Sequence, residues 1–338
     1  MVTIREVAKK AGVSTTTVSH VLNGSRLVSV ATASRVRRAM QELHYKPNAV
    51  ARSLRRKHTL TLGLVVPDSS NPFFAEMARG VEDYTFDHGY SVIFGSSNSN
   101  LERERAYLQV LIEKQVEGLV FVSAGESSPN IKYLQSESIP VVILDREFEG
   151  VQADYLTSDN RRGGFLATEH LISLGHRAIG CITGPSAIVS SAQRVLGYRE
   201  ALAAYSIPYQ PDLVVEGDYT ATSGYTATQR FLAMGSRRPT AIFALNDMMA
   251  MGCLGAIHEA GLRVPDDVAV VGFDDIVLAS YTFPPLTTVR QQKYEMGRLA
   301  AKIIIDRTQS GDGSEPQRHV LPVELIVRGS TAQAPQGV

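Results

Sequence analysis

From Leu60 to about residue 330, short runs rich in β-branched residues alternate with amphipathic segments, and this alternation restricts the fold more than any other feature. Strands are expected at 61–66, 91–94, 118–122, 141–144, 178–183, 241–245 and 268–273. Helices are expected between them, for example at 75–88, 102–114, 163–174, 194–204, 224–234 and 248–260. Such alternation is typical of parallel sheets with helices on both faces. Its length predicts two similar, doubly wound lobes that bind a ligand at the carboxyl ends of their strands.

The basic and acidic residues are distributed unevenly along the chain, and the change comes at about residue 58. The whole chain has equal numbers of basic and acidic residues, 34 of each. Residues 1–58 contain 12 Lys and Arg residues but only two acids, Glu6 and Glu42, so this segment is +10 and the remainder is −10. This asymmetry predicts a small anion-binding module attached to a larger acidic body.

A helix-turn-helix is expected within the basic segment. Thr3 to Glu6 has the T-x-x-E pattern of a capping box, which predicts a helix that starts at Thr3 and ends at Gly12. Ser14 can cap a second helix two residues later, and Asn23-Gly24 ends it. The buried face of the second helix is expected to consist of Val18, Val21 and Leu22. Two short helices joined by a tight glycine-containing turn form a helix-turn-helix.

The second helix is expected to present short hydrogen-bonding side chains to a DNA major groove. Away from its apolar face lie Thr15, Thr16, Ser19 and His20. Such side chains can donate to and accept from base edges. A third helix, at about 32–43, is expected to bury Val36, Met40 and Leu43 and to leave Arg35, Arg37 and Arg38 outside. Any three-helix unit could show this pattern, but the +10 charge favours DNA binding.

The segment at 48–56 is basic and has a weak helical pattern. Asn48 can cap a helix of about two turns, which is too short to be stable alone in water. The segment is therefore either a flexible basic linker or a helix that forms only on a partner. In the second interpretation Leu54 is an apolar wedge between base steps of a minor groove, with Arg52 and Arg55 on phosphates. Val50 and Leu54 could then meet the same residues of a second subunit.

Polar residues follow the expected strands of the body. Asp145-Arg146, Asn246-Asp247 and Asp274-Asp275 come directly after strands, and Arg194 opens a helix soon after another strand. Carboxylate and guanidinium groups at strand ends can bind the adjacent hydroxyls of a sugar in pairs. Each residue alone could merely cap the next helix, and Asp247 in particular could do only that. Because four such sites converge, a binding site is the favoured interpretation.

The chain lacks the sequence patterns of the common catalytic and metal sites. It contains no GxxxxGK[ST] loop, no GxGxxG after a strand, no GxSxG and no HExxH. Cys181 and Cys253 form no CxxC pair and have no metal-ligand spacing with nearby histidines. Asp274 and Asp275 do not suit an acid pair, because neighbours that leave a strand point in different directions. Neither an enzyme, nor a cofactor, nor a metal is therefore expected.

The start of the chain carries no apolar signal core, and no apolar stretch approaches the roughly 20 residues needed to span a bilayer. A cytoplasmic protein with no membrane partner is therefore expected. The strongest alternative from another class is a sugar-binding transport receptor, whose body would look the same. Such a receptor needs export, and it would leave the basic segment unexplained.

Two motifs resemble a known family. The sequences GVSTTTVSHVLN at 12–23 and NAVARSL at 48–54 are similar to the headpiece and hinge of the LacI/GalR bacterial transcription regulators, closest to the purine and ribose repressor branch. The resemblance extends to about residue 329. It implies a small all-α helix-turn-helix headpiece at 1–47 and a hinge helix or linker at 48–59. It also implies a periplasmic-binding-protein-like α/β body of two lobes at 60–330, which binds an effector and dimerises, and a tail at 331–338.

The resemblance implies a repressor whose homodimer binds a near-palindromic double-stranded DNA operator. The tail at 329–338 has no heptad pattern, so a dimer rather than a tetramer is expected. The expected DNA contacts are Ser14, Thr15, Thr16, Thr17, Ser19, His20, Asn23, Arg26, Val50, Leu54 and Arg55. The expected effector contacts are Phe73, Phe74, Asp145, Arg146, Ser190, Arg194, Tyr219, Asn246 and Asp274.

Two departures from the family pattern bear on the identity of the effector. Purine-binding members carry an arginine where this chain has Ile188, and a tryptophan where it has Arg146. The pocket is therefore expected to hold a small polyhydroxy ligand, a pentose or hexose with ribose as the first candidate. A purine corepressor is the alternative. Whether the ligand releases DNA or recruits it is left open by the sequence.

Overall fold

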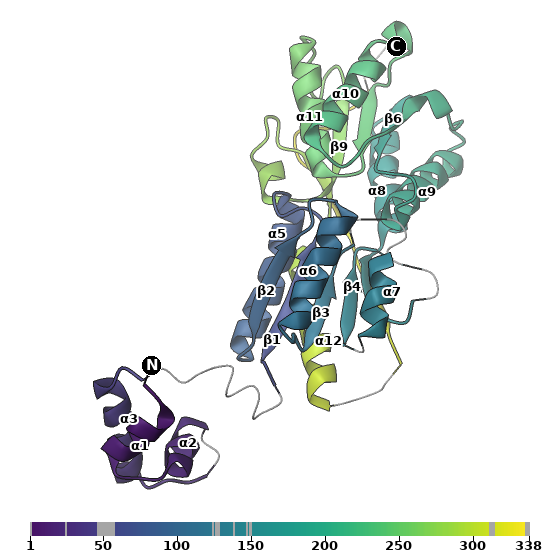
Figure 1. The fold of residues 1–338 in the computed structure, drawn as a ribbon. Coiled ribbons are helices and arrows are strands. Elements are labelled where there is room, and N and C mark those ends of the chain that lie inside the picture. The colour runs from purple at the N-terminus through teal and green to yellow at the C-terminus, as the bar shows by residue number, and fades with distance from the viewer. Residues whose placement is uncertain are drawn as a thin grey trace. The chain divides into compact units, whose positions relative to one another are not determined.

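The computed structural model describes residues 2–23, 26–45, 58–123, 125, 129–137, 139–146, 148, 151–310 and 315–334. The chain divides into two compact units, Met1–Thr59 and Leu60–Val338, and each is described by itself (Figure 1). Among the described residues, no helix combines the length and the apolar character that a membrane crossing needs.

The first unit consists of three helices, α1 (Ile4–Ala11), α2 (Thr15–Asn23) and α3 (Val30–Glu42). The predicted capping box is present, because Thr3 Oγ1 accepts from the Glu6 amide at 3.4 Å and Glu6 Oε2 accepts from the Thr3 amide at 2.7 Å. Gly12 ends α1 with a left-handed φ of 65°. The core that joins the helices contains Val7, Ala8, Ala11, Val18, Val36 and Ala39.

The second unit contains two six-stranded sheets, which we call the N-terminal and C-terminal lobes. The strand order of the N-terminal lobe is β11 (Arg318–Leu321), β5 (Asp154–Ser158), β4 (Val141–Leu144), β3 (Gly118–Phe121), β1 (Thr61–Val66) and β2 (Ser91–Ser96). That of the C-terminal lobe is β12 (Glu324–Ile326), β10 (Thr287–Arg290), β9 (Ala269–Asp274), β8 (Ala241–Ala244), β6 (Ile179–Thr183) and β7 (Val214–Glu216). Only β10 and β12 pair antiparallel among the described strands. The doubly wound architecture predicted from the sequence is confirmed.

Helices cover both faces of each sheet (Figure 1). In the N-terminal lobe α5 (Pro72–Asp87) and α12 (Lys293–Ser310) lie on one face, and α6 (Leu101–Glu113) and α7 (Pro129–Ser136) on the other. In the C-terminal lobe the two pairs are α8 (Asn160–Ser173) with α9 (Val189–Ala204), and α10 (Ala221–Leu232) with α11 (Asp247–Glu259). The central strands are buried along their whole length, as parallel strands covered on both faces must be.

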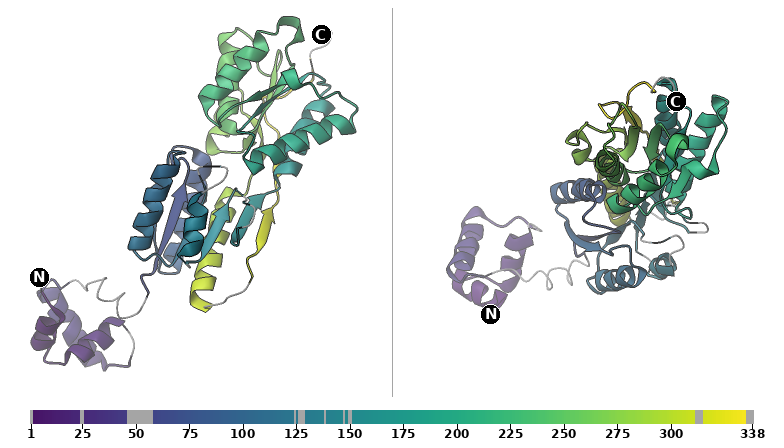
Figure 2. Two further views of the ribbon diagram at one scale, coloured as in Figure 1. Left: turned by 45° about the vertical axis from the view of Figure 1, so that its right-hand side comes forward. Right: turned by 90° about the horizontal axis from the view of Figure 1, so that it is seen from above.

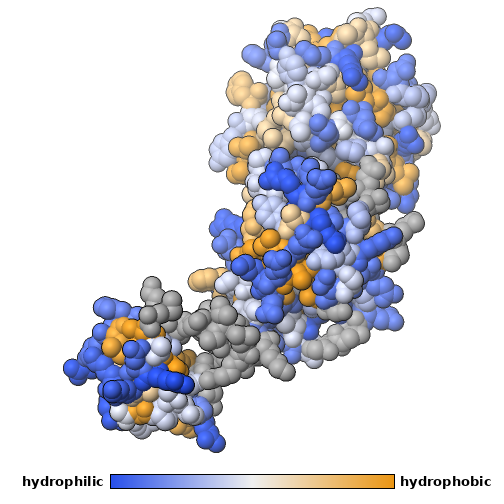
Figure 3. Space-filling view, in the orientation of Figure 1, coloured by the Kyte–Doolittle hydropathy of each residue, from blue (hydrophilic) through white to orange (hydrophobic). Residues whose placement is uncertain are grey.

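The outer surface of the protein is mixed in character. On the face shown in Figure 3, hydrophilic side chains cover much of the surface, and hydrophobic ones lie in separate areas between them. The large apolar side chains of the sheets, such as Phe121, Phe243 and Phe273, are instead fully buried. Burial of this kind is the main contribution to the stability of the two lobes.

Within the described residues the chain passes between the two lobes three times, at 158–160, 290–293 and 321–324. We call these segments the crossovers. As a result, α12 follows a strand of the C-terminal lobe but packs on α5, β3 and β4 of the N-terminal lobe (Figure 2). Each lobe is therefore built from segments that are distant in the sequence.

Two glycines bring α8 and α9 unusually close together. A Cβ atom on Gly164 would lie 2.1 Å from the carbonyl oxygen of Arg194, and one on Gly197 would lie 2.1 Å from that of Arg161. Real atoms do not approach so closely, so the backbones meet only because both residues lack side chains. The position of Arg194 is thus set by the packing of these two helices.

Candidate functional site

A cavity of about 120 Å³ lies between the two lobes of the body. All nine residues predicted to contact an effector line it: Phe73, Phe74, Asp145, Arg146, Ser190, Arg194, Tyr219, Asn246 and Asp274. The sequence did not single out six further lining residues: Pro67, Asp68, Asn71, Ser99, Asp218 and Thr220. These six lie at or near the first turns of helices or in loops, where no periodic pattern marks them.

The cavity wall contains residues with an unusual backbone conformation. Asp145, Tyr219 and Asp274 have φ values of 57°, 70° and 121°. Such values are uncommon for residues other than glycine and cost on the order of 1–3 kcal/mol each. They persist only where the surrounding structure enforces them, and they cluster at functional sites.

Arg194 is buried and held in a fixed orientation from three sides. Only 3% of the residue is exposed. Its Nε donates to Asn160 Oδ1 at 2.8 Å, and its Nη1 donates to the carbonyl oxygen of Leu245 at 2.6 Å. The guanidinium also lies over the Phe273 ring at 3.8 Å from the centroid. The side chain is therefore already in place for a ligand.

Asp274 lies close to Arg194 in the wall of the cavity. Its Oδ1 lies 3.8 Å from Arg194 Nη1 and accepts from Gln291 Nε2 at 2.7 Å. Burial raises the pKa of the Asp274 carboxyl to about 7, while the positive charges of Arg194 and Lys293 act in the opposite direction. A carboxyl group in this position can accept from a ligand hydroxyl, and when protonated it can also donate.

Asp145 and Arg146 carry buried polar atoms without partners. Each residue is 8% exposed. Asp145 Oδ1 and Arg146 Nε and Nη1 make no hydrogen bond to any residue that the structure describes. Burial raises the pKa of the Asp145 carboxyl. Buried polar groups almost always have a partner, so these atoms mark Asp145 and Arg146, which both line the cavity, as candidate ligand contacts.

Aromatic rings form the apolar part of the wall. Phe73 and Phe74 lie at the start of α5 and meet edge to face, with ring centroids 5.1 Å apart. The Tyr219 ring packs so closely against Gly184 that a Cβ there would lie 2.1 Å from the ring. Both phenylalanines are buried and also belong to the core, so they serve packing as well as the cavity.

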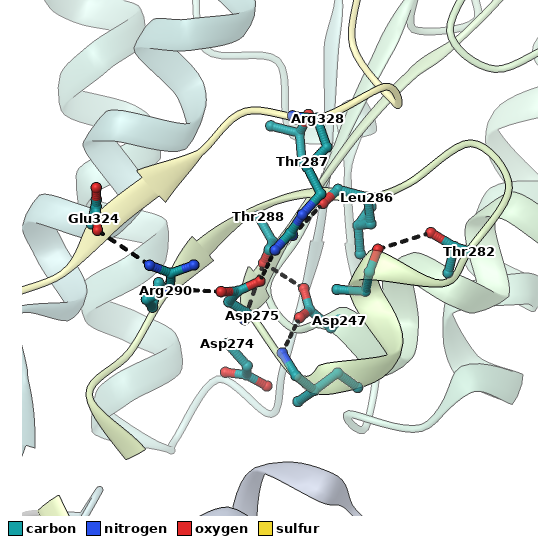
Figure 4. A network of polar contacts seen from close by, with 12 residues as sticks. Asp247, Asp274, Asp275, Thr282, Leu286, Thr287, Thr288, Arg290, Glu324 and Arg328 are labelled. Carbon is teal, nitrogen blue, oxygen red and sulfur yellow. Dashed lines mark hydrogen bonds and ion pairs between the residues drawn. The ribbon is translucent and has the colours of Figure 1, made fainter. Parts of the chain in front are cut away.

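The structure corrects one expectation about the strand ends. Asp247 does not cap α11, because Asn246 does so with its Oδ1, which accepts from the Met249 amide at 2.9 Å. Asp247 is fully buried and instead accepts from Thr288 Oγ1 at 2.5 Å and from the Ile276 amide at 2.8 Å (Figure 4). The helix begins one residue earlier than the sequence suggested, which moves Asp247 into its first turn.

Asp275 does not line the cavity, and its carboxylate lies apart from that of Asp274, as expected for neighbours at a strand end (Figure 4). Its carboxylate accepts from Arg290 Nε at 2.7 Å and from Arg328 Nη2 at 2.6 Å. Arg290 also lies 3.6 Å from Glu324. These ion pairs fasten β9, β10 and the segment around β12 together beside two of the crossovers.

The headpiece exposes most of the predicted DNA-binding side chains that the structure describes. Ser14, Thr15, Thr16 and Arg26 are exposed, and Thr17 and His20 are half-buried. Ser19 is only 6% exposed, so the expectation that it lies on the outer face was wrong. Because α2 packs against both α1 and α3, its buried arc is wider than the apolar stripe alone predicts.

Some predictions for the DNA-binding part cannot be placed. Asn23 is the last residue of α2, and its side chain is outside the described part of the structure. Val50, Leu54 and Arg55 lie in the hinge segment, which is outside the described residues.

Comparison with known proteins identifies two regions. Residues 3–48 match the family described as bacterial regulatory proteins, lacI family, and residues 168–331 match the periplasmic binding protein-like domain. The chain is 40% identical over 332 residues to the HTH-type transcriptional repressor PurR of Aliivibrio fischeri (strain MJ11), covering 98% of each chain.

Two solved structures are similar over nearly the whole chain. A lac repressor dimer bound to operator and the anti-inducer ONPF is 32% identical with a TM-score of 0.87, and the match covers 98% of this chain and 99% of that one. A complex of the transcriptional regulator CelR with cellobiose is 37% identical with a TM-score of 0.73, and the match covers 98% and 100%.

A helix-turn-helix unit followed by a two-lobed body with a buried polar cavity defines a DNA-binding transcriptional repressor with an effector-binding domain, which is a non-enzymatic class. The chain belongs to the lacI family of bacterial regulatory proteins.

Proposed function

We propose that a small polyhydroxylated molecule, a pentose or hexose, binds in the cavity and sets the affinity of a homodimer for a near-palindromic operator. The observation that carries the proposal is the set of buried polar atoms without described partners on Asp145 and Arg146, in a cavity that Arg194 and Asp274 also line. The site of action is the bacterial cytoplasm, where the operator DNA is found.

The chemistry of the lining favours a sugar. Adjacent hydroxyl groups donate to carboxylates and accept from guanidinium groups, and the wall supplies both kinds in Asp145, Asp274, Arg146 and Arg194. The aromatic rings can cover the apolar face of a sugar ring. A relative with 37% identity was solved with cellobiose, which supports a carbohydrate ligand.

A purine is the second candidate, because curated relatives with about 40% identity are named PurR repressors. Ile188, which replaces the arginine of purine-binding members, is at the N-cap of α9 and is nearly buried. An apolar side chain there offers no donor to a base edge. This difference favours the sugar over the purine.

For DNA recognition we propose that α2 enters the major groove with Thr15 and Thr16 toward the bases. A second helix, formed on DNA by residues 48–56, inserts Leu54 into the minor groove. Ligand binding changes the angle between the lobes by rotation about the crossovers, which alters the separation of the two hinge segments in the dimer. The ligand acts because its affinity for the two states differs.

Thermal unfolding with a panel of pentoses, hexoses, nucleosides and free purines tests the ligand class. A ligand at about 100 times its Kd adds about 2.7 kcal/mol of stability. The expected result is stabilisation by a sugar in the wild type and none in Asp145→Asn. Stabilisation by a purine alone would contradict the sugar proposal. Operator binding by fluorescence anisotropy, with and without the active ligand, then distinguishes induction from corepression.

A further inference from the structure

Leu60, the first residue of the second unit, has a left-handed backbone with a φ of 50°. This conformation is uncommon for a residue other than glycine and costs free energy. Hydrogen bonds hold both sides of the residue. The Leu60 amide donates to Glu117 Oε1 at 2.8 Å, and the Leu60 carbonyl oxygen accepts from the Ser91 amide at 2.9 Å. The chain is therefore held in a fixed conformation directly before β1 begins, and we call Leu60 and Glu117 the Leu60 junction.

The acceptor for the Leu60 amide is a side chain rather than a carbonyl oxygen of the neighbouring strand. The pairing of β1 with β3 starts at Leu62, which lies opposite Gly118. Glu117 comes directly before β3, and its own amide donates to the carbonyl oxygen of Thr61 at 2.8 Å. Glu117 thus binds two successive residues at the point where the chain enters the lobe, one through its side chain and one through its backbone.

Glu117 is itself held in place by its neighbours. A Cβ atom on Gly118 would lie 2.2 Å from Cγ2 of Ile304, so α12 contacts the backbone of β3 directly beside Glu117 (Figure 1). Thr308, in the last turn of α12, shares its hydroxyl between the carbonyl oxygens of Ile304 at 2.8 Å and Glu117 at 3.3 Å. Burial, and next the negative charge of Glu117, raise the pKa of the Tyr90 hydroxyl, which places the carboxylate near that buried side chain. Glu117 can therefore hold Leu60 in one position.

The place of the Leu60 junction in the chain gives it a consequence for DNA binding. The residues before Leu60 carry the helix-turn-helix, and those after it form the two lobes. A repressor that binds two half-sites as a dimer must present its two helix-turn-helix units at the spacing of those half-sites. Free rotation at the point of attachment would lower the effective concentration of the second unit at its half-site, and a fixed attachment limits this loss.

We propose that Glu117 is a positioning residue for DNA binding, which holds Leu60 and so fixes the direction in which the chain leaves the N-terminal lobe. The inference rests on the proposed homodimer on a near-palindromic operator, but not on the identity of the effector. The alternative is a hydrogen bond that serves the stability of the lobe alone. The two explanations differ in the effect that loss of the bond has on the preferred half-site spacing.

Three variants change the Leu60 junction. Glu117→Ala removes the acceptor, whereas Glu117→Gln keeps an oxygen that can accept from the Leu60 amide. Leu60→Gly keeps both hydrogen-bonding groups but removes the steric limit on the backbone, so the chain gains freedom at this point. The matched controls are Glu113→Ala, which removes an exposed carboxylate at the end of α6, and Gln115→Gly, which places a glycine at another left-handed position with a φ of 55°.

Fluorescence anisotropy of the full-length protein, without effector, provides the measurement. The probe is a duplex that the wild type selects from a random-sequence library, together with the same duplex lengthened or shortened at its centre by one base pair. The wild type is expected to bind the selected spacing most tightly. Glu117→Ala and Leu60→Gly are expected to bind it about tenfold more weakly and to lose most of the preference for it. Glu117→Gln and both controls are expected to behave as the wild type.

Thermal unfolding of each variant identifies a loss of folded protein, which would lower the apparent affinity for every duplex by the same factor. If Glu117→Ala weakens binding equally at all three spacings, or binds as the wild type does, Glu117 has no positioning role, while the proposed dimer stands. If the wild type itself binds all three spacings equally, the proposal of a dimer on a near-palindrome fails, and the inference about Glu117 fails with it.

Discussion

The Nζ atom of Lys293 donates to the backbone carbonyl oxygen of Asp274 at 2.7 Å. It also donates to that of Asp275 at 2.8 Å and lies 3.5 Å from the Glu76 carboxylate on α5. Lys293 is only 2% exposed. One buried lysine thus supports the left-handed backbone at two successive aspartates of the C-terminal lobe and contacts the N-terminal lobe at the same time.

Lys293→Met is expected to lower the free energy of unfolding by about 2–4 kcal/mol, because two hydrogen bonds to a charged donor are lost. It should also weaken ligand binding, since the turn that carries Asp274 loses its support. Urea denaturation and calorimetry measure the two effects. Lys302→Met, on the same helix but in an exposed ion pair with Asp306, is the control and should cost less than about 1 kcal/mol.

The stability of the unliganded protein is expected to fall as the pH rises toward 7. Burial raises the pKa of Asp274 to about 7 from an ordinary value near 3.8, so between these values the folded state binds a proton that the unfolded state has released. The stabilisation that comes from the protonated Asp274 carboxyl is therefore complete below about pH 3.8, and it is lost as the pH rises through about 7.

Asp274→Asn should flatten this dependence in urea titrations between pH 5 and pH 8, whereas Asp212→Asn, at an exposed position, should not. An unchanged slope in Asp274→Asn would show that this carboxyl does not titrate in the window. The same variant is expected to bind operator normally but to lose the response to ligand.

Gly164→Ala is expected to destabilise the protein by about 1–3 kcal/mol or more, because the added Cβ would lie 2.1 Å from the Arg194 carbonyl oxygen. Displacement of α9 should also weaken ligand binding through Arg194. In Gly255→Ala the nearest atom would be 3.9 Å away, so that substitution should be neutral or stabilising by up to about 1 kcal/mol. Equal effects of the two substitutions on unfolding would refute the close-packing explanation.

Thr16→Ala is expected to relax base preference at one position of each half-site by about 1–3 kcal/mol, with little effect on stability, because the side chain is exposed. Anisotropy titrations against operators mutated one base pair at a time give the measurement. Ser34→Ala, an exposed hydroxyl on α3, is the control. A uniform loss of affinity for all sequences would instead indicate a phosphate contact.

Leu54→Ala is expected to weaken specific operator binding while leaving ligand affinity intact, since it removes the apolar wedge. Fluorescence anisotropy measures the operator affinity of the variant, and calorimetry measures its ligand affinity. Operator affinity equal to that of the wild type would rule out the wedge.

The central strands were predicted to within about two residues, because buried parallel strands have continuous apolar runs. Strands β5, β7 and β10 to β12 were missed, since most are short and several carry polar residues. The start of α9 was placed at Arg194 rather than Val189, because Ile188 gives no capping side chain to mark it.

The predicted cavity residues converge because the carboxyl ends of parallel strands meet at one edge of a sheet. Two predictions were wrong: that Ser19 lies on the outer face of α2, and that Asp247 caps α11. Both errors arise from tertiary packing. The burial of Ser19 depends on two neighbouring helices, and the partners of Asp247 lie on β10 and after β9. No local pattern contains that information.

The crossovers have a consequence for synthesis on the ribosome. The N-terminal lobe needs α12 and β11, from residues 293–321, to complete its sheet and cover one face. The three helices at 4–42 have a core of their own and can fold as soon as they emerge. Neither lobe can complete its sheet until almost the whole chain has been translated, because β11 and β12 are the last strands to be made. A nascent chain that stalls before β11 therefore leaves one side of β5 unpaired, and an unpaired strand edge promotes aggregation.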